Sequence, residues 1–334
     1  MHELRKDPII GRWVIIASDR AGRPTDFVID RQMPSGGSCP FCYGSEDKTP
    51  PEVLAYRAPG TAPDSPGWRV RVVPNKYPAL RIEGALGRRA AGMYDLMNAV
   101  GAHEVVIESP DHEAQLADFA PRQIVDVLWA YHDRFVDLKR DPRFRYILLF
   151  KNQGAEAGAT LEHAHTQIIA TPVVPKRVSE EIDGARHHFE QRERCIFCDI
   201  VHQEIEQGVR VVTQNEQFVV LEPFAARFPF ETWILPLRHA AQFETLEADG
   251  IEALAVVLHE TLRRVKAALD GPPFNYVLHT SPTRGDGVGE FYHWHIEIIP
   301  KLTRVAGFEW GSGFYINPTP PEVAAAELRK ASIE

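Results

Sequence analysis

The segment "GATLEHAHTQIIATP", residues 158–172, decides how this chain is built. Polar residues alternate and then run into the apolar stretch "IIA", a pattern typical of the start of a β-strand. Side chains two residues apart lie on one face of a strand, so His163, His165 and Gln167 are expected to point the same way. Two imidazoles and a carboxamide on one face could bind a metal ion, attack an electrophile or hold an anion, whereas an ordinary polar strand face does not need this set.

A second segment, "HWHIEIIP" at 293–300, repeats the pattern of two histidines entering an apolar strand. Both segments follow an aromatic, β-branched run, "FRYILLFKN" in the first case and "FNYVLHTSP" in the second. Apolar residues recur at helical spacing ahead of each run, at 120–141 and 248–271. The chain is therefore predicted to contain an internal repeat.

Each repeat is predicted to be α+β, built as two strands, a helix and two strands, with the helix packed on an antiparallel sheet. Residues 1–172 would form the N-terminal half and 195–334 the C-terminal half. The charged stretch 173–194 would be a helical or extended connector. If the two halves pair their sheets, one wider sheet presents the face that carries His165 and Gln167.

The four cysteines form two C-x-x-C pairs, "CPFC" at 39–42 and "CIFC" at 195–198. In a reducing compartment this spacing is more often a zinc site or a redox centre than a structural disulfide. A thioredoxin-type redox pair would begin a helix after a strand, whereas these pairs follow turn-rich and charged stretches. The pattern favours two metal-binding knuckles.

Histidines complete the predicted metal sites in the same order in both halves. An isolated histidine stands before each predicted helix, and the first histidine of each H-x-H follows it. We expect two closed, tetrahedral structural zinc sites per chain. The predicted ligands are Cys39, Cys42, His112 and His163 for the first site and Cys195, Cys198, His239 and His293 for the second.

The remaining histidines are expected to be of two kinds. His279 lies in an apolar run and is predicted to be a core residue with a partner. The others lie on helix faces or in charged stretches and are expected to be solvated; they include His103, His132, His187, His188, His202 and His259.

Composition restricts the class of partner. The 334 residues allow about two domains, and 44% hydrophobic with 25% charged residues is ordinary for a globular protein. A net charge of -9 disfavours nucleic acid or an anionic membrane as partner but permits a local basic pocket for a phosphorylated ligand. The opening residues lack the apolar core of a signal peptide, and no apolar run approaches the length of a membrane span. We expect a cytoplasmic protein.

If His163 binds a metal, His165 is left free beside it. A neutral imidazole is a competent nucleophile toward phosphorus, and Gln167 can donate a hydrogen bond to a phosphate oxygen. The preceding "KNQGAEAGAT" is rich in glycine and alanine, which lets backbone amides and Thr160 approach a phosphate. The second half carries Glu297 where the first has Gln167, and its carboxylate would repel a phosphate. The first half is therefore predicted to be catalytic.

H-x-H-x-Q, "CPFC", "SPDH", "NQGA" and the opening "GRWVIIASDRAGRP" together resemble the galactose-1-phosphate uridylyltransferase family of the histidine triad superfamily, over nearly the whole chain. The resemblance implies two histidine-triad-like α/β repeats, with helices packed on antiparallel sheets. It implies ping-pong uridylyl transfer between UDP-glucose and galactose 1-phosphate, through a covalent uridylyl-histidine at His165 with Gln167 on the phosphate. A homodimer is expected. The substrate-binding positions that the resemblance implies are Arg20, Arg23, Phe41, Asn75, Asn152, Gly158 and Thr160.

Other features resemble a plant-type subgroup of ADP-glucose phosphorylases. These are the second pair "CIFC" and the ending "GFEWGSGFYINP". The usual uridylyltransferases have a glutamate and histidines at their second metal site. The second site of this chain could therefore hold zinc or iron. The usual uridylyltransferases also have a hexose-contacting glutamine where this chain has Tyr315. Uridylyl transfer is favoured by the match at Asn75 and Asn152. The alternatives are adenylyl transfer from ADP-glucose to phosphate, hydrolysis of a nucleotide sugar, and a zinc-stapled nucleotide-binding module without activity.

Overall fold

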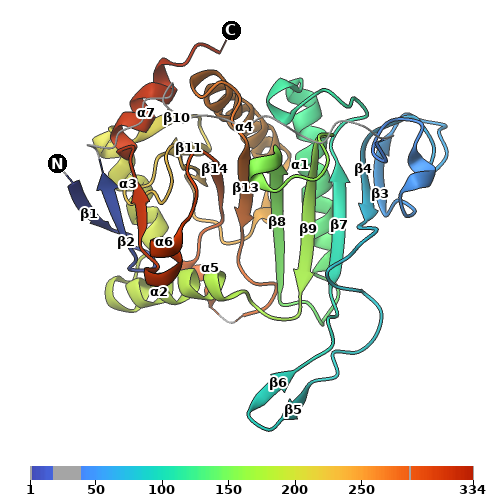
Figure 1. The fold of residues 1–334 in the computed structure, drawn as a ribbon, viewed down its shortest axis with the longest axis horizontal. Coiled ribbons are helices and arrows are strands. Elements are labelled where there is room, and N and C mark those ends of the chain that lie inside the picture. The colour runs from blue at the N-terminus through green and yellow to red at the C-terminus, as the bar shows by residue number, and fades with distance from the viewer. Residues whose placement is uncertain (1, 18–38, 286, 334) are drawn as a thin grey trace.

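One antiparallel sheet of ten strands runs through both halves of the protein in the computed structural model, which describes residues 2–17, 39–285 and 287–333 (Figure 1). The strand order is β10-β11-β12-β14-β13-β8-β9-β7-β4-β3. The N-terminal half supplies β3 (Leu54–Arg57), β4 (Trp68–Pro74), β7 (Ala102–Ile107), β8 (Tyr146–Gln153) and β9 (His165–Thr171). The C-terminal half supplies β10 (Val211–Gln214), β11 (Phe218–Leu221), β12 (Thr232–Pro236), β13 (Phe274–His279) and β14 (His295–Pro300).

The predicted repeat and the pairing of the two halves are confirmed. Strand β8 of one half and β13 of the other pair antiparallel, in a register that runs from Gln153 opposite Phe274 to Leu149 opposite Leu278. Each half supplies three strands of this sheet before its helix instead of the two expected. The additional strands, β3 and β10, have four residues each and lie at the edges of the sheet. Such short segments carry too little alternation to be recognised from sequence.

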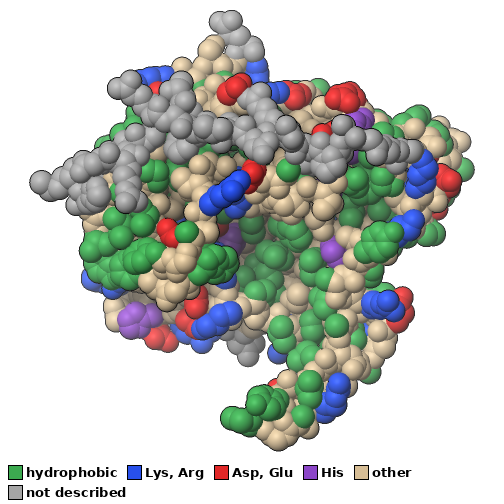
Figure 2. Space-filling view, in the orientation of Figure 1, with side chains coloured by type: hydrophobic (Ala, Val, Ile, Leu, Met, Phe, Trp, Pro, Cys, Tyr) green, Lys and Arg blue, Asp and Glu red, His purple; other side chains and the backbone are tan. Residues whose placement is uncertain are grey.

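The two predicted helices cover one face of this sheet. They are α1 (Pro121–Leu138) and α4 (Ala248–Ala268). Their apolar stripes are buried against strand residues in a single core, with Ile124 and Leu128 from α1 and Leu254 from α4 fully buried. The opposite face is turned toward the viewer in Figure 1, and Figure 2 shows that it is hollowed across its middle, with histidine side chains visible in the hollow.

Smaller elements surround the main sheet. Strand β15 (Tyr315–Asn317) pairs in parallel with β2 (Trp13–Ala17), which pairs in turn with β1 (His2–Lys6). A hairpin of β5 (Arg89–Ala91) and β6 (Tyr94–Leu96) projects from the body (Figure 1). The other helices are α2 (Lys176–Arg192), α3 (Ile196–Gln207), α5 (Val288–Phe291), α6 (Gly307–Ser312) and α7 (Pro321–Lys330), with 3-10 turns η3 (Glu46–Lys48), η4 (Leu116–Asp118), η5 (Ala155–Ala157) and η6 (Phe243–Thr245). Within the described ranges no helix is both long and apolar enough to span a membrane.

The second cysteine pair lies at the start of a helix. Cys195 is the N-cap residue of α3 and Cys198 lies in its first turn, so this pair does begin a helix. The charged stretch before it forms helix α2, so the pair follows a helix and not a strand. The pair therefore lacks the preceding strand that a thioredoxin-type redox pair would have, as the sequence predicts.

Helix α2 packs against the turn between β1 and β2 at Gly184. A Cβ added at this glycine would lie 1.8 Å from the carbonyl oxygen of Ile9. Any larger residue must push the helix and the turn apart. The absence of a side chain at Gly184 therefore allows the N-terminal hairpin of β1 and β2 to pack closely against α2.

We predict that Gly184→Ala lowers the free energy of unfolding by about 1–3 kcal/mol, the usual cost of overpacking. This sign is distinctive because alanine stabilises most helices relative to glycine. The matched control is Gly311→Ala in α6, where an added Cβ meets nothing within 4 Å. Urea unfolding of both variants makes the measurement. A G184A protein as stable as G311A would show that the close contact with Ile9 is not maintained.

Candidate active site

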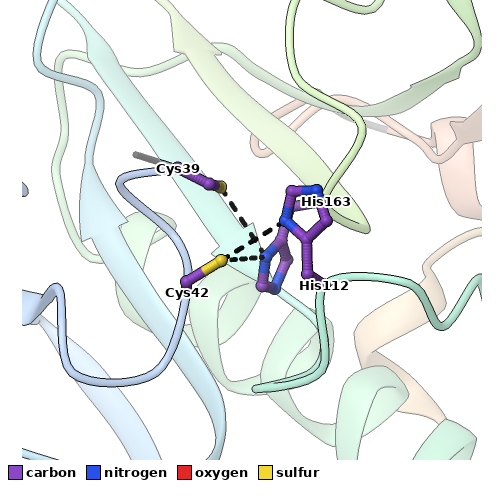
Figure 3. A group of neighbouring side chains, drawn as sticks. All are labelled: Cys39, Cys42, His112 and His163. Atoms are coloured by element: carbon purple, nitrogen blue, oxygen red, sulfur yellow. Dashed lines mark hydrogen bonds between the residues drawn. The ribbon is translucent and has the colours of Figure 1, made fainter. Parts of the chain in front are cut away.

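Four of the predicted metal ligands meet in one compact group (Figure 3). Cys39 and Cys42 come from the loop before η3, His112 follows β7, and His163 precedes β9. The Nδ1 atom of His112 lies 3.3 Å from Cys42 Sγ, and that of His163 lies 3.8 Å from each cysteine sulfur. All four ligand atoms lie within 4.8 Å of one another. The group can hold a metal ion.

The spacing of these atoms fits a tetrahedral site. Zinc bonds of about 2.3 Å to sulfur and about 2.05 Å to nitrogen place two tetrahedral ligands roughly 3.6 Å apart. The other ring nitrogen of His163 lies 2.7 Å from the carbonyl oxygen of Ser109. Because that carbonyl only accepts, Nε2 carries the proton and Nδ1 keeps its lone pair for a metal.

The second group has the same geometry. The Nδ1 atoms of His239 and His293 lie 3.3 Å and 3.6 Å from Cys198 Sγ. Their Nε2 atoms lie 2.8 Å and 3.0 Å from the carbonyl oxygens of Gly289 and Pro236. With Cys195 these residues form a second group that can hold a metal ion.

A third set of metal-competent side chains is Glu181, His279 and His295, all buried. Its members already have partners. His279 donates from Nδ1 to Glu181 at 3.0 Å, and its Nε2 lies 3.5 Å from Glu297. Burial alone disfavours the charged ring of His279, but the two carboxylates outweigh it and raise the pKa of His279 to about 10. His279 is thus the partnered core histidine that its apolar strand predicts.

His165 is the first residue of β9 and is buried. Its Nδ1 lies 2.8 Å from the carbonyl oxygen of His163. Nδ1 must therefore donate, which leaves the lone pair on Nε2. Burial, together with the nearby charge of Lys151, lowers the pKa of His165, so the ring is neutral at pH 7. A neutral imidazole with a fixed tautomer is a ready nucleophile.

A cavity of about 290 Å³ lies beside His165. It is lined by residues of both halves, including Asn152 and Gly154 of the first and the segment 271–273 of the second. The corresponding space beside His295 is about 10 Å³. There the ring of His279 stacks on His295 at a centroid distance of 4.7 Å. Only the first half therefore has room for a ligand at its second H-x-H histidine, among the described residues.

A buried ion pair supports the strand that carries His165. Lys151 donates to Glu108 at 2.7 Å and to the carbonyl oxygen of His165 at 3.0 Å. Glu108 also accepts from Tyr131 at 2.8 Å and from the hydroxyl of Thr166. Sequence reasoning missed this group. The available signal was a charged residue at the end of each of two apolar strand runs, Glu108 in "HEVVIESP" and Lys151 in "YILLFKN".

The structure brings several of the predicted substrate-binding residues near His165. The ring of Phe41 lies 5.4 Å from that of His165, edge to face. Asn152 lines the cavity, and its Oδ1 accepts from Asn275 at 2.8 Å. Gly158 caps η5 in the left-handed region, with φ at 88°. Thr160 is exposed and lies outside the cavity lining. Arg20 and Arg23 lie outside the described residues.

Gln167 and Asn75 meet at a residue that sequence reasoning placed among the solvated histidines. His103 is half-buried on β7, with Nε2 at 2.8 Å from Gln167 Oε1 and at 3.1 Å from Asn75 Nδ2. The expectation for His103 is therefore wrong. Its neighbours come from β9 and from the loop after β4, a proximity that only the sheet pairing creates.

The chain belongs to the galactose-1-phosphate uridylyltransferase family. Residues 1–175 match the family's N-terminal domain and residues 181–329 its C-terminal domain. The family and its relatives are nucleotidyltransferases, so the fold and site define an enzyme of that class.

Relatives of two kinds share this fold and most of its length. An ADP-glucose phosphorylase of Arabidopsis thaliana is 40% identical over 99% of this chain and 93% of its own. A galactose-1-phosphate uridylyltransferase of Thermotoga maritima is 30% identical over the full length of both. Among solved structures, the Arabidopsis ADP-glucose phosphorylase with bound ADP-glucose has a TM-score of 0.85 at 39% identity, covering 100% of each chain. A uridylyltransferase has a TM-score of 0.76 at 31% identity, covering 98% of this chain and 97% of its own.

We predict that Lys151→Met lowers the free energy of unfolding by about 3–5 kcal/mol, because Glu108 is then left buried without its cation. The control is Lys266→Met, whose partner Asp118 is exposed and whose loss should cost at most about 1 kcal/mol. Chemical unfolding monitored by circular dichroism compares the two. Equal stabilities of K151M and K266M would contradict the role given to this ion pair.

Proposed function

We propose that this chain transfers a nucleotidyl group by way of His165. Nε2 of His165 attacks the α-phosphorus of a nucleoside diphosphate sugar, and an N–P bond forms as the bond to the sugar phosphate breaks. Sugar 1-phosphate leaves. In the second half of the cycle a phosphate oxygen of the acceptor attacks the same phosphorus and His165 departs. The observation that carries this proposal is a neutral, buried imidazole with its lone pair on Nε2, beside a cavity of about 290 Å³.

The surrounding residues support each step of this cycle. Attack makes the imidazole ring positive, and the bond from Nδ1 to the carbonyl oxygen of His163 stabilises that charge. Gln167 shares the strand face of His165 and supplies a carboxamide for a non-bridging phosphate oxygen. Phe41 packs against the His165 ring and gives that side of the site an apolar wall.

Zinc is the metal we propose for the two Cys/His groups, two ions per chain. Thiolates favour zinc over magnesium or calcium. Four protein ligands leave no open position for a catalytic water, so the ion would be structural. At the first group it would tie the loop that carries Phe41 to His163, the residue whose carbonyl orients the nucleophile.

We favour ADP-glucose as the nucleotide sugar and inorganic phosphate as the acceptor. Support comes from the 40% identity to the Arabidopsis ADP-glucose phosphorylase, against 30% to the Thermotoga uridylyltransferase. The second Cys-x-x-Cys group points the same way. Uridylyl transfer between UDP-glucose and galactose 1-phosphate, which the sequence favoured, is the second candidate, and the match of both family domains supports it. The homodimer and the cytoplasmic location stay predictions.

We predict that ADP-glucose labelled at its α-phosphate leaves a stable labelled enzyme, and that His165→Ala abolishes the label. The control is His132→Ala, because His132 lies on α1 and contacts Asp133 and Trp129, away from the site. Labelling followed by denaturing gel separation makes the measurement. A labelled H165A protein would show that another residue is the nucleophile. Rapid hydrolysis of ADP-glucose in the absence of phosphate would indicate a nucleotide-sugar hydrolase. Binding of ADP-glucose without any labelling of the enzyme would indicate a nucleotide-binding module without activity.

The rate of glucose 1-phosphate release tests which base of the nucleotide sugar the enzyme prefers. A site built for one base edge leaves buried groups unpaired with the other, at about 1–3 kcal/mol per group. We therefore expect glucose 1-phosphate to be released at least about tenfold faster from ADP-glucose than from UDP-glucose, each at limiting concentration. The reverse preference would select the second candidate and leave the histidine mechanism standing.

Metal analysis tests the two sites. We predict two zinc ions in the purified chain and one in Cys42→Ser or Cys198→Ser, each with stability lowered by several kcal/mol because a structural ligand is lost. His279→Gln, in the third set, should keep both ions. Loss of metal from H279Q with none from C198S would place the second ion at Glu181, His279 and His295 instead.

A further inference from the structure

His103 lies between two carboxamides and a backbone amide. Ala79, in the loop after β4, donates its N–H to His103 Nδ1 at 3.1 Å. On the other side of the ring, Nε2 lies 2.8 Å from Gln167 Oε1 and 3.1 Å from Asn75 Nδ2. The imidazole thus bridges strand β9, which carries His165, and the segment 75–79.

The donors and acceptors fix which ring nitrogen carries the proton. A backbone N–H can only donate, so Nδ1 of His103 must accept, and the proton of the neutral ring is on Nε2. Among the described residues, Gln167 Oε1 is the acceptor of that proton, at 2.8 Å. The oxygen of the Gln167 carboxamide is therefore engaged, and its NH2 group is left to donate elsewhere.

The same tautomer constrains Asn75. Its Oδ1 accepts from the N–H of Tyr77 at 2.8 Å, so its NH2 end faces His103. Because Nε2 of His103 is protonated, it cannot accept from this NH2 group. The NH2 group of Asn75 therefore has no acceptor on the His103 ring.

We propose that His103 is a positioning residue that fixes the Gln167 carboxamide with its NH2 group toward the α-phosphate of the nucleotide and anchors the segment 75–79 beside it. The inference rests on the proposed function. A rotated Gln167 would present its oxygen to a non-bridging phosphate oxygen, and two acceptors repel. Since the phosphate gains charge at its equatorial oxygens as the leaving group departs, a fixed donor there lowers the barrier to transfer.

Two substitutions separate the two hydrogen bonds of the His103 ring, the one from Ala79 and the one to Gln167. The amide of asparagine reaches the position of Nδ1, so His103→Asn keeps an acceptor for Ala79 and loses the donor to Gln167. The amide of glutamine reaches the position of Nε2, so His103→Gln keeps that donor and loses the acceptor for Ala79. We expect H103N to slow nucleotidyl-enzyme formation at saturating ADP-glucose by about tenfold, with KM within about twofold of the parent. H103Q should recover most of that rate and raise KM.

The double variant H103N/Q167A separates positioning from a general loss of structure. Because His103 acts on the rate through Gln167, H103N should change the rate by less than about twofold once Gln167 is alanine. If His103 has only a structural role, H103N should slow Q167A and the parent enzyme by the same factor. Melting temperatures of all four proteins accompany the rates.

Labelling of the parent enzyme and of His165→Ala runs in parallel. A labelled parent and an unlabelled H165A support the proposed function whatever His103 does. The inference about His103 is then overturned if H103N matches the parent rate, if H103N and H103Q behave alike, or if H103N and Q167A are additive. A parent enzyme that forms no adduct with ADP-glucose or UDP-glucose overturns the proposed function, and this inference with it.

Discussion

The antiparallel pairing of β8 with β13 is the contact on which the site depends. It joins the two repeats into one continuous sheet. The segment 271–273, which precedes β13, is thereby brought opposite Gly154 at the end of β8, and both line the cavity beside His165. A Cβ at Gly154 would approach Pro273 to 2.8 Å, so the two halves meet there with no space for a side chain.

The two halves share one arrangement of cysteines and histidines and differ in the residues that fill the space beside it. In the first half, Lys151 pairs with Glu108 and donates to the backbone carbonyl oxygen of His165. These charged residues leave the cavity beside the His165 ring unfilled. In the second half, charged residues occupy the site itself. Arg227 donates to Glu297 at 2.5 Å, and Glu297 and Glu181 enclose His279 against His295. These ion pairs fill the space beside His295, which is about 10 Å³.

Local sequence patterns predicted those parts of the structure that depend on neighbours in the chain. Helical and alternating periodicities located α1, α4 and the central strands, and the repeated order of cysteines and histidines located both groups of candidate ligands. The role of His103 and the buried pair of Lys151 and Glu108 could not be predicted in this way. They exist because the register of β7 with β9 sets Val105 opposite Gln167, a tertiary choice that no short segment specifies. The short edge strands were missed because four residues carry too little pattern.

The parallel pairing of β15 with β2 ties residues near the C-terminal end of the described chain to residues near its N-terminal end. Strand β2 pairs with β1 on its other side, so during synthesis on the ribosome the N-terminal hairpin leaves one edge of β2 without its partner until β15 has emerged. An exposed strand edge is a template for pairing with other chains. The ribosome must translate residues 18–314 between these two events, and during that interval the open edge of β2 exposes the nascent chain to aggregation, which a chaperone can prevent.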